Sequence, residues 1–256
     1  MIEPFETPWG SKVLSFASLD STSRYLWREA EAGAPHGTVV VADQQISGRG
    51  RRGRQWHSPA GLNLYFSVLL RPSIKLEKVP QFSLVAAAAL WQGLRNKSSE
   101  LTLKWPNDLF CRGLKLAGIL SEMKPDSTQA EFVIIGVGLN VNAEISDFPL
   151  DLRGQVTSLK CECRRTFELA VLLENILQEF ALFSEIFYRE GLGGSIGDLI
   201  NRNFYLADKN IVINSGSGKI KCRARAIDSN GSLLGTLADG SEVSFNAGEA
   251  WLVKGN

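Results

Sequence analysis

The sequence is poor in the residues that bind metals and form disulfides. Its 256 residues include four cysteines and two histidines. Cys161 and Cys163 form a lone Cys-x-Cys pair, and His36 and His57 lie far from it in the sequence, so a structural zinc site lacks ligands. The cysteines also do not form the paired framework of a small secreted domain. We therefore expect reduced thiols and a cytoplasmic protein.

Long apolar runs and a strong net charge are also missing. The longest apolar stretch, around residues 84–91, falls far short of the ~20 residues that a membrane span needs. The N-terminus carries Glu3, Pro4, Glu6 and Pro8 where a signal peptide has basic and then apolar residues. A net charge of +1 gives no overall attraction to nucleic acid or to an anionic membrane. Any anion-binding role must come from a local cluster.

The composition that remains is that of an ordinary globular protein, with 44% hydrophobic and 21% charged residues. Periodicity and turn residues predict helices at 21–32, 82–94 and 166–188, and strands at 13–16, 38–42, 62–70, 101–105, 109–111, 114–123 and 132–141. From residue 211 onward, glycines interrupt short strands. The sequence thus predicts a mixed α/β (α+β) domain at residues 1–207 and a small β domain at residues 208–256.

The most unusual segment is GRGRRGR, residues 48–54, inside a long polar loop at residues 44–59. Glycine lets the backbone approach a ligand closely, and arginine offers a planar fork that pairs with phosphate or carboxylate oxygens. Such a loop could be solvated surface, contact nucleic acid, or cover a small phosphorylated ligand. Its single occurrence between two apolar strands disfavours an RNA-binding tail. No helix follows its GxGxxG pattern, which disfavours a dinucleotide fold.

A second signal is the segment KWPNDL, residues 104–109, followed by Lys115 within GLKLAGIL. A lysine between two leucines on a buried hairpin strand is costly unless it meets an anion. Because strand residues alternate between faces, Lys115 could equally lie on the solvated face.

These motifs occur in one order with DSTSRYL (residues 20–26), ADQQISGRGRRGRQWHSPAGLNLYFS (42–67), GLKLAGILSE up to residue 122, and GVGLNVN (136–142). The series resembles the biotin–protein ligases, also called biotin–[acetyl-CoA-carboxylase] ligases. The resemblance covers about residues 15–142, with a weaker echo in AGEAWLV near the C-terminus. It implies a mixed-sheet catalytic domain, related to lipoate ligases, followed by an SH3-like β-barrel.

The resemblance also implies an activity in two steps that uses ATP, biotin and Mg²⁺. Biotin's carboxylate attacks the α-phosphate of ATP to give biotinyl-5′-AMP and pyrophosphate. A specific lysine on the biotin carboxyl carrier domain of a carboxylase then takes the biotinyl group and releases AMP. The alternatives are a lipoate or other acyl–protein ligase on the same fold, and an RNA-binding module. We expect a monomer or a homodimer.

The site residues that the resemblance implies fall into three groups. Biotin is contacted by Ser21, Thr22, Ser23, Gln45, Arg49, Gly50, Arg51, Lys115 and Gly118. ATP and the adenylate are contacted by Arg49, Arg51, Trp56, Lys115 and Asn140. Asn107 and Asp108 either help to place Mg²⁺ and phosphate or simply form a turn. Lys115 and Arg51 are the expected catalytic residues, and the loop at residues 143–159 is expected to fold over the nucleotide.

The chain departs from the family pattern in three places. Ser23 stands where asparagine is usual, which puts one polar contact near the biotin pocket in question. Val253 stands where some members have an arginine that reaches the nucleotide, and Lys254 would point to the opposite face of a regular strand. The chain begins almost directly with catalytic sequence, so we expect no helix-turn-helix domain, no DNA binding and no repressor activity.

Overall fold

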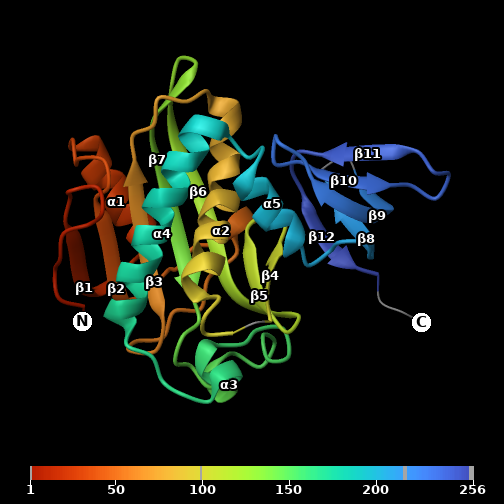
Figure 1. Ribbon diagram of the computed structural model, residues 1–256. Helices are drawn as coiled ribbons and strands as arrows, with labels where there is room; N and C mark the ends of the chain where they lie inside the picture. Colours follow the sequence, from red (N-terminus) through yellow and green to blue (C-terminus); the bar gives the residue numbers. More distant parts are fainter. Residues whose placement is uncertain (1, 99, 216–217, 254–256) are drawn as a thin grey trace.

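Two β-sheets lie side by side in the computed structural model, which describes residues 2–98, 100–215 and 218–253 (Figure 1). The larger sheet contains β1 (Val13–Leu19), β2 (Val39–Gln45), β3 (Leu64–Leu70), β4 (Leu101–Lys104), β5 (Asp108–Cys111), β6 (Leu114–Asp126) and β7 (Gln129–Leu139). The smaller one contains β8 (Asn210–Asn214), β9 (Lys219–Ile227), β10 (Leu233–Thr236), β11 (Glu242–Phe245) and β12 (Glu249–Leu252). The helices are α1 (Thr22–Glu31), α2 (Phe82–Leu94), α3 (Leu159–Cys163), α4 (Leu169–Glu190) and α5 (Ser195–Arg202).

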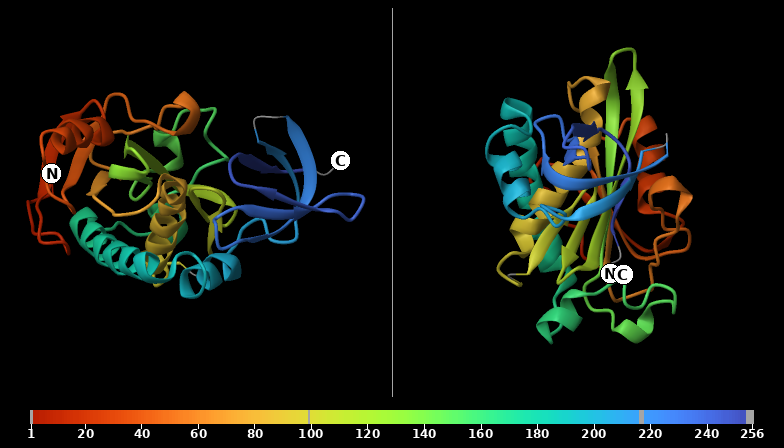
Figure 2. Two further views of the ribbon diagram at one scale, coloured as in Figure 1. Left: turned by 90° about the horizontal axis from the view of Figure 1, so that it is seen from above. Right: turned by 90° about the vertical axis from the view of Figure 1, so that its right-hand side faces the viewer.

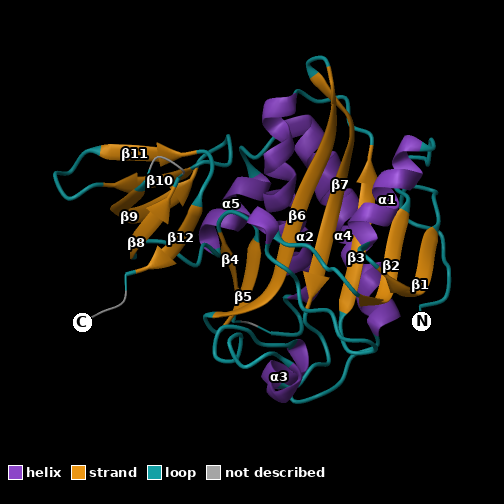
Figure 3. Ribbon diagram, turned by 180° about the vertical axis from the view of Figure 1, so that it is seen from behind, coloured by secondary structure: helices purple, strands orange, loops and turns teal. Residues whose placement is uncertain are grey.

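The larger sheet has the strand order β1-β2-β3-β7-β6-β5-β4. Only β1 and β2 pair in parallel, and the other neighbours are antiparallel, which confirms the mixed α/β prediction. Helices α2 and α4 cover one face, and α1 lies on the opposite face over β2, β3 and β7 (Figure 2). The rest of that opposite face, from β7 to β4, stays free of helices (Figure 3).

Alternation along the strands decides which face each side chain joins. Val39 and Val41 of β2 pack into the large core under α2 and α4, whereas Val40 packs under α1 with Leu26 and Ala30. Because both faces of the inner strands are covered, β3 is buried along its whole length.

The long apolar helix α2 lies between the sheet and α4. Its four consecutive alanines, residues 86–89, are all buried, and small side chains of this kind let a helix pack closely on its neighbours. Gly93 of α2 faces Ile176 of α4, where an added Cβ would be 3.5 Å from the isoleucine side chain.

The smaller sheet is joined to the larger one through α5 and the β4–β5 turn. Asn201 on α5 exchanges two hydrogen bonds with the Ile227 backbone, at 2.8 and 2.9 Å. The buried Trp105 indole donates to the Gly231 carbonyl at 2.9 Å. These contacts hold the C-terminal strands against the β4 edge of the larger sheet (Figure 1).

The expected helices and strands are present, with shifted ends. The third helix begins at Leu169 and not at residue 166, and the last strand of the larger sheet begins at Gln129 and not at residue 132. Helices α3 and α5 were not expected, because each is short and α5 follows a run of glycines. Among the described residues, no helix is long and apolar enough to cross a membrane.

Candidate active site

A cleft of about 320 Å³ lies on the sheet face that the helices leave free. Register places Asp108, Gly118 and Gly138 side by side across β5, β6 and β7, so they share this face. Every residue that the sequence assigns to the site lines the cleft: Ser21, Thr22, Ser23, Gln45, Arg49, Gly50, Arg51, Trp56, Asn107, Asp108, Lys115, Gly118 and Asn140. Its volume lies within the range of about 300–1,000 Å³ that is usual for small-molecule sites.

A cluster of hydroxyls forms the end of the cleft near α1. Ser21 is the residue before the helix, so its neighbours Thr22 and Ser23 are fixed by the first turn of α1. The Oγ of Ser67 on β3 lies 2.8 Å from the Thr22 hydroxyl and 3.0 Å from the Ser23 hydroxyl. Thr22 also donates to Gln45 Oε1 through its backbone N–H, at 2.9 Å. The cluster can therefore both donate and accept hydrogen bonds.

The space beside these hydroxyls depends on Gly136. A Cβ at this position would come within 2.5 Å of Ser23 Oγ. The serine that replaces the family's asparagine is thus bound to Ser67 and packed against a glycine.

Arg49 starts the arginine–glycine loop and reaches back to the sheet. Its Nη1 lies 2.8 Å from Glu122 Oε1 on β6, and the arginine side chain is 41% exposed against 20% for the glutamate. An ion pair of this exposure contributes under about 1 kcal/mol, so it places the loop more than it stabilises the fold.

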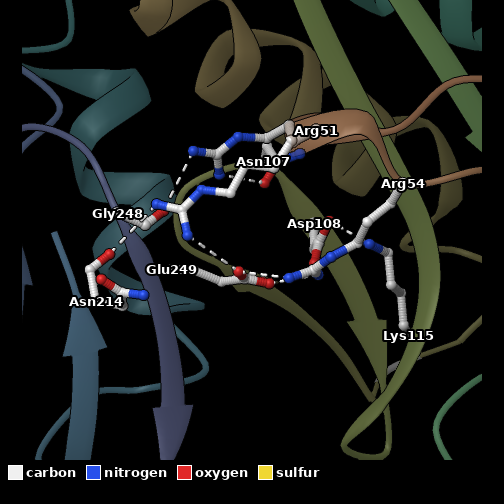
Figure 4. Close-up of polar contacts among 9 residues, drawn as sticks. Arg51, Arg54, Asn107, Asp108, Lys115, Asn214, Gly248 and Glu249 are labelled. Carbon is white, nitrogen blue, oxygen red and sulfur yellow. Dashed lines mark hydrogen bonds and ion pairs between the residues drawn. The ribbon is translucent and has the colours of Figure 1, made fainter. Parts of the chain in front are cut away.

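Arg51 points into the cleft from a 3₁₀ turn at Arg51–Gly53 (Figure 4). Its Nη1 donates to Asn107 Oδ1 at 3.1 Å, and its Nη2 donates to the Gly248 carbonyl of the smaller sheet at 3.2 Å. Burial and the neighbouring Arg52 lower the pKa of Arg51, while Asp108 opposes them. Asn107 also donates to the Ile119 carbonyl at 2.5 Å, which fixes its amide for Arg51.

The last two arginines of the loop meet a carboxylate of the smaller sheet. Arg54 pairs with Glu249 of β12 at 2.5 Å, and Arg52 pairs with the same carboxylate at 3.4 Å (Figure 4). Both arginines are more than two fifths exposed, so they brace the loop against the C-terminal strands and lie at the rim of the cleft.

Lys115 lies on β6 and faces the cleft, which settles the alternation in favour of an inward ammonium. Its Nζ is 2.7 Å from Asp108 Oδ1 and 5.4 Å from the centre of the Trp56 ring. Its backbone bonds the second long loop on both sides, accepting from Thr157 and donating to Gln155 at 2.9 Å. The chain around Lys115 is therefore held from both neighbouring segments.

Trp56 lies flat over two glycines in the middle of the cleft. A Cβ on Gly138 would overlap its indole ring, and a Cβ on Gly118 would be 2.9 Å from Cζ3. The buried Nε1 of Trp56 and the buried Oδ1 of Asn140 have no hydrogen-bond partner among the described residues. Asn140 is oriented by its amide, which donates to the Thr157 carbonyl at 2.9 Å.

The two long loops and β12 complete the walls of the cleft. Phe148, Leu152 and Val156 line it from the loop at residues 143–159. From β12 come Glu249, Ala250 and Trp251. Val253 is 41% exposed and does not line the cleft, and Lys254 lies outside the described residues.

Among the described residues, no group of three or more His, Cys, Asp or Glu side chains could hold a metal ion. Sequence reasoning missed Ser67, Glu122 and Glu249. Their partners are 44, 73 and 195 positions away, so only the folded chain brings them together.

Two family models match the chain. Residues 15–140 match the biotin/lipoate A/B protein ligase family, and residues 208–253 match the biotin protein ligase C-terminal domain. A bifunctional ligase/repressor BirA from Bacillus spizizenii is 36% identical over 233 residues, which is 90% of this chain and 70% of that protein. The chain belongs to the biotin protein ligase family.

Further similarities support this family assignment. The BirA protein of Bacillus subtilis is 41% identical over 169 residues, covering 66% of this chain and 52% of that protein. The chain thus spans only about half of one relative's length. The biotin protein ligase of Aquifex aeolicus, solved in complex with biotin and ATP, superposes with a TM-score of 0.81 at 27% identity, covering 95% of this chain and 99% of that one.

Proposed function

We propose that this protein activates biotin with ATP to form biotinyl-5′-AMP, and that it transfers the biotinyl group to a specific lysine of a carboxylase's biotin carboxyl carrier domain. The observation that carries the proposal is the order of groups along one cleft. A hydroxyl cluster lies at one end, Lys115 and Arg51 lie in the middle, and Trp56 and Asn140 stand beside them. Family membership supports the same reaction.

The hydroxyl end suits the ureido ring of biotin. That ring offers two N–H donors and one carbonyl acceptor, so its pocket needs groups of both kinds. Ser21, Thr22 and Ser23 carry hydroxyls that can do either, and Gln45 adds an amide whose Nε2 donates to Ser58 at 3.1 Å. Arg49 and Gly50 would cover the bound biotin from the loop, and Gly118 leaves room on the sheet below it.

The middle of the cleft supplies positive charge where the reaction develops negative charge. A carboxylate oxygen of biotin bonds to the α-phosphorus, and the bond from that phosphorus to the bridging oxygen breaks as pyrophosphate leaves. Lys115 and Arg51 would hold the carboxylate and the α-phosphate together and stabilise the transition state. Asp108 and Asn107 keep these two cations in place.

Trp56 and Asn140 suit the adenylate. A buried polar atom without a hydrogen bond costs about 1–3 kcal/mol, and the cleft holds two of them, a donor on Trp56 and an acceptor on Asn140. Adenine carries both ring acceptors and an amino donor, so it can satisfy either atom. The indole face would also pack against the base.

Magnesium would enter with the nucleotide. The described residues hold no cluster of acidic ligands, and Asp108 with Asn107 already contacts Lys115 and Arg51. The ion would therefore be held mainly by the phosphates, near Asp108, where it neutralises part of their charge.

In the second step, the amine of the carrier lysine attacks the carbonyl carbon of the mixed anhydride. The amide bond forms, a proton is released, and AMP leaves with the electron pair of the broken bond. The same cations that hold the phosphate would stabilise the departing AMP.

The proposal is tested by incubating the protein with biotin, ATP, Mg²⁺ and a carrier domain, and by detecting biotinylated carrier with streptavidin. Lys115→Ala should lower the rate about 100-fold, by analogy with the loss of one transition-state charge contact. Lys124→Ala is the matched control, because Lys124 lies on the same strand outside the cleft and pairs with Glu131 at 3.1 Å. Transfer that is unaffected by Lys115→Ala would contradict the assigned role.

A further inference from the structure

Lys104 occupies an unusual position at the far end of the cleft. It is the last residue of β4, the outermost strand of the larger sheet, and it lines the cleft. Alternation sends Leu101 and Leu103 of this strand into the core and leaves Lys104 on the cleft face, in register with Asp108. Its close partner is the ring of Phe110, whose centre is 4.9 Å from Nζ.

Lys104 differs from the other cations of the cleft in lacking an oxygen partner. Arg49, Arg51, Arg54 and Lys115 each contact a carboxylate or an amide oxygen. Among the described residues, none forms an ion pair or a hydrogen bond with the Lys104 ammonium. Burial lowers its pKa, with Asp108 opposing that effect. A largely desolvated ammonium that faces a cleft without an acceptor is a position suited to an anionic ligand.

The order of strands says which part of ATP would lie there. The hydroxyl cluster is at β3 and β7, Lys115 is on β6, Asp108 on β5 and Lys104 on β4. In a displacement at phosphorus, the attacking and leaving oxygens lie roughly in line on opposite sides. If biotin attacks from the β7 side, pyrophosphate leaves toward β4. Two strand spacings, roughly 10 Å, separate the strands of Lys115 and Lys104, which is within the combined reach of a triphosphate and a lysine.

We propose that Lys104 is a catalytic residue of the first half-reaction, binding the β- and γ-phosphates of ATP and the departing pyrophosphate. When the bond between the α-phosphorus and the bridging oxygen breaks, its electron pair stays on the pyrophosphate. The Lys104 ammonium stabilises that charge and transfers no proton. This inference rests on the proposed function, because it assumes that the cleft makes an acyl adenylate from ATP.

The two half-reactions separate this role from a structural one. Pyrophosphate takes part in adenylate formation and is absent from transfer, so Lys104→Met should slow biotin-dependent exchange of labelled pyrophosphate into ATP at least 30-fold. Transfer from supplied biotinyl-AMP to a carrier domain should stay within twofold of the wild-type rate. Lys104→Arg keeps the charge and should recover much of the exchange. Lys124→Met, on the neighbouring β6 outside the cleft, should leave both rates unchanged.

Product inhibition gives an independent measurement. The inhibition constant of inorganic pyrophosphate should rise at least tenfold in Lys104→Met, and that of AMP should change less than twofold. Equal losses in both half-reactions, or an unchanged pyrophosphate constant, would overturn the assignment. A wild-type protein that makes no biotinyl-AMP would instead sink the proposed function, and with it the role of Lys104.

Discussion

A single methyl group at Gly138 should weaken the nucleotide end of the cleft without removing any polar group. Gly138 lies in β7 in an extended conformation that alanine also adopts, so Gly138→Ala changes only the occupied space. Its Cβ would overlap the indole of Trp56. The ring cannot move sideways over Gly118, because the Lys115 ammonium already lies 5.4 Å from its centre. It must therefore leave its place or strain the strand.

The magnitude follows from those two outcomes. Overpacking of this kind costs about 1–3 kcal/mol when the structure absorbs it. If Trp56 swings away, an aromatic contact worth about 0.5–1.5 kcal/mol is lost with the adenine, together with the indole donor. Either way we expect KM for ATP to rise about 10- to 100-fold, since about 1.4 kcal/mol corresponds to a factor of ten.

Gly136→Ala is the matched control on the same strand and the same face. Its Cβ would meet Ser23 Oγ at 2.5 Å, so it should raise KM for biotin and leave KM for ATP within about threefold. Initial rates of biotinyl-AMP formation, with one substrate varied and the other saturating, give both constants. Thermal unfolding of each variant checks that the fold is intact. A Gly138→Ala variant whose two KM values rise equally, or not at all, would refute the placement of Trp56 at the nucleotide.

Three further predictions concern contacts around the cleft and in the core. Ser67→Ala removes the hydroxyl that bonds two hydroxyls of α1, so KM for biotin should rise about 5- to 10-fold, at about 1 kcal/mol per bond; an unchanged value in steady-state assays would count against it. Glu249→Gln loosens two exposed ion pairs, each worth under about 1 kcal/mol, so trypsin should cut the arginine–glycine loop two to five times faster, while Glu242→Gln should cut at the wild-type rate. Burial lowers the pKa of His36 below 6.5, so its contribution to stability is full above that value and is lost as the pH falls through the lowered pKa. The melting temperature should therefore drop less in His36→Gln than in wild type between about pH 7.5 and 5.

The sequence predicted the parts of the fold that depend on local pattern. The alternation of residues 64–70 and the apolar helix at residues 82–94 follow from periodicity alone, and the structure has both. The α/β class and the small C-terminal sheet are confirmed in the same way. Helix α5 escaped prediction because it is short and starts after Gly193 and Gly194, which normally end a helix.

The site was predictable as a set of residues and not as a network. The motifs named thirteen side chains that all line one cleft, although none of them is adjacent in sequence to all the others. What the sequence could not supply were the long-range partners, such as Glu249 for Arg54 and Ser67 for Ser23. Those pairings depend on where β12 and β3 lie, and no local pattern encodes that. The isolation of Lys104 likewise becomes visible only when its neighbours are placed.

The central claim is that this cleft makes an adenylate of biotin. The most direct test incubates the purified protein with ATP, Mg²⁺ and an equal mixture of biotin and lipoate, and identifies the acyl-AMP by mass spectrometry. The account predicts biotinyl-AMP with little or no lipoyl-AMP, and a loss of product of about 100-fold in Lys115→Ala. Lipoyl-AMP as the main product, or no adenylate of either acid, would contradict it.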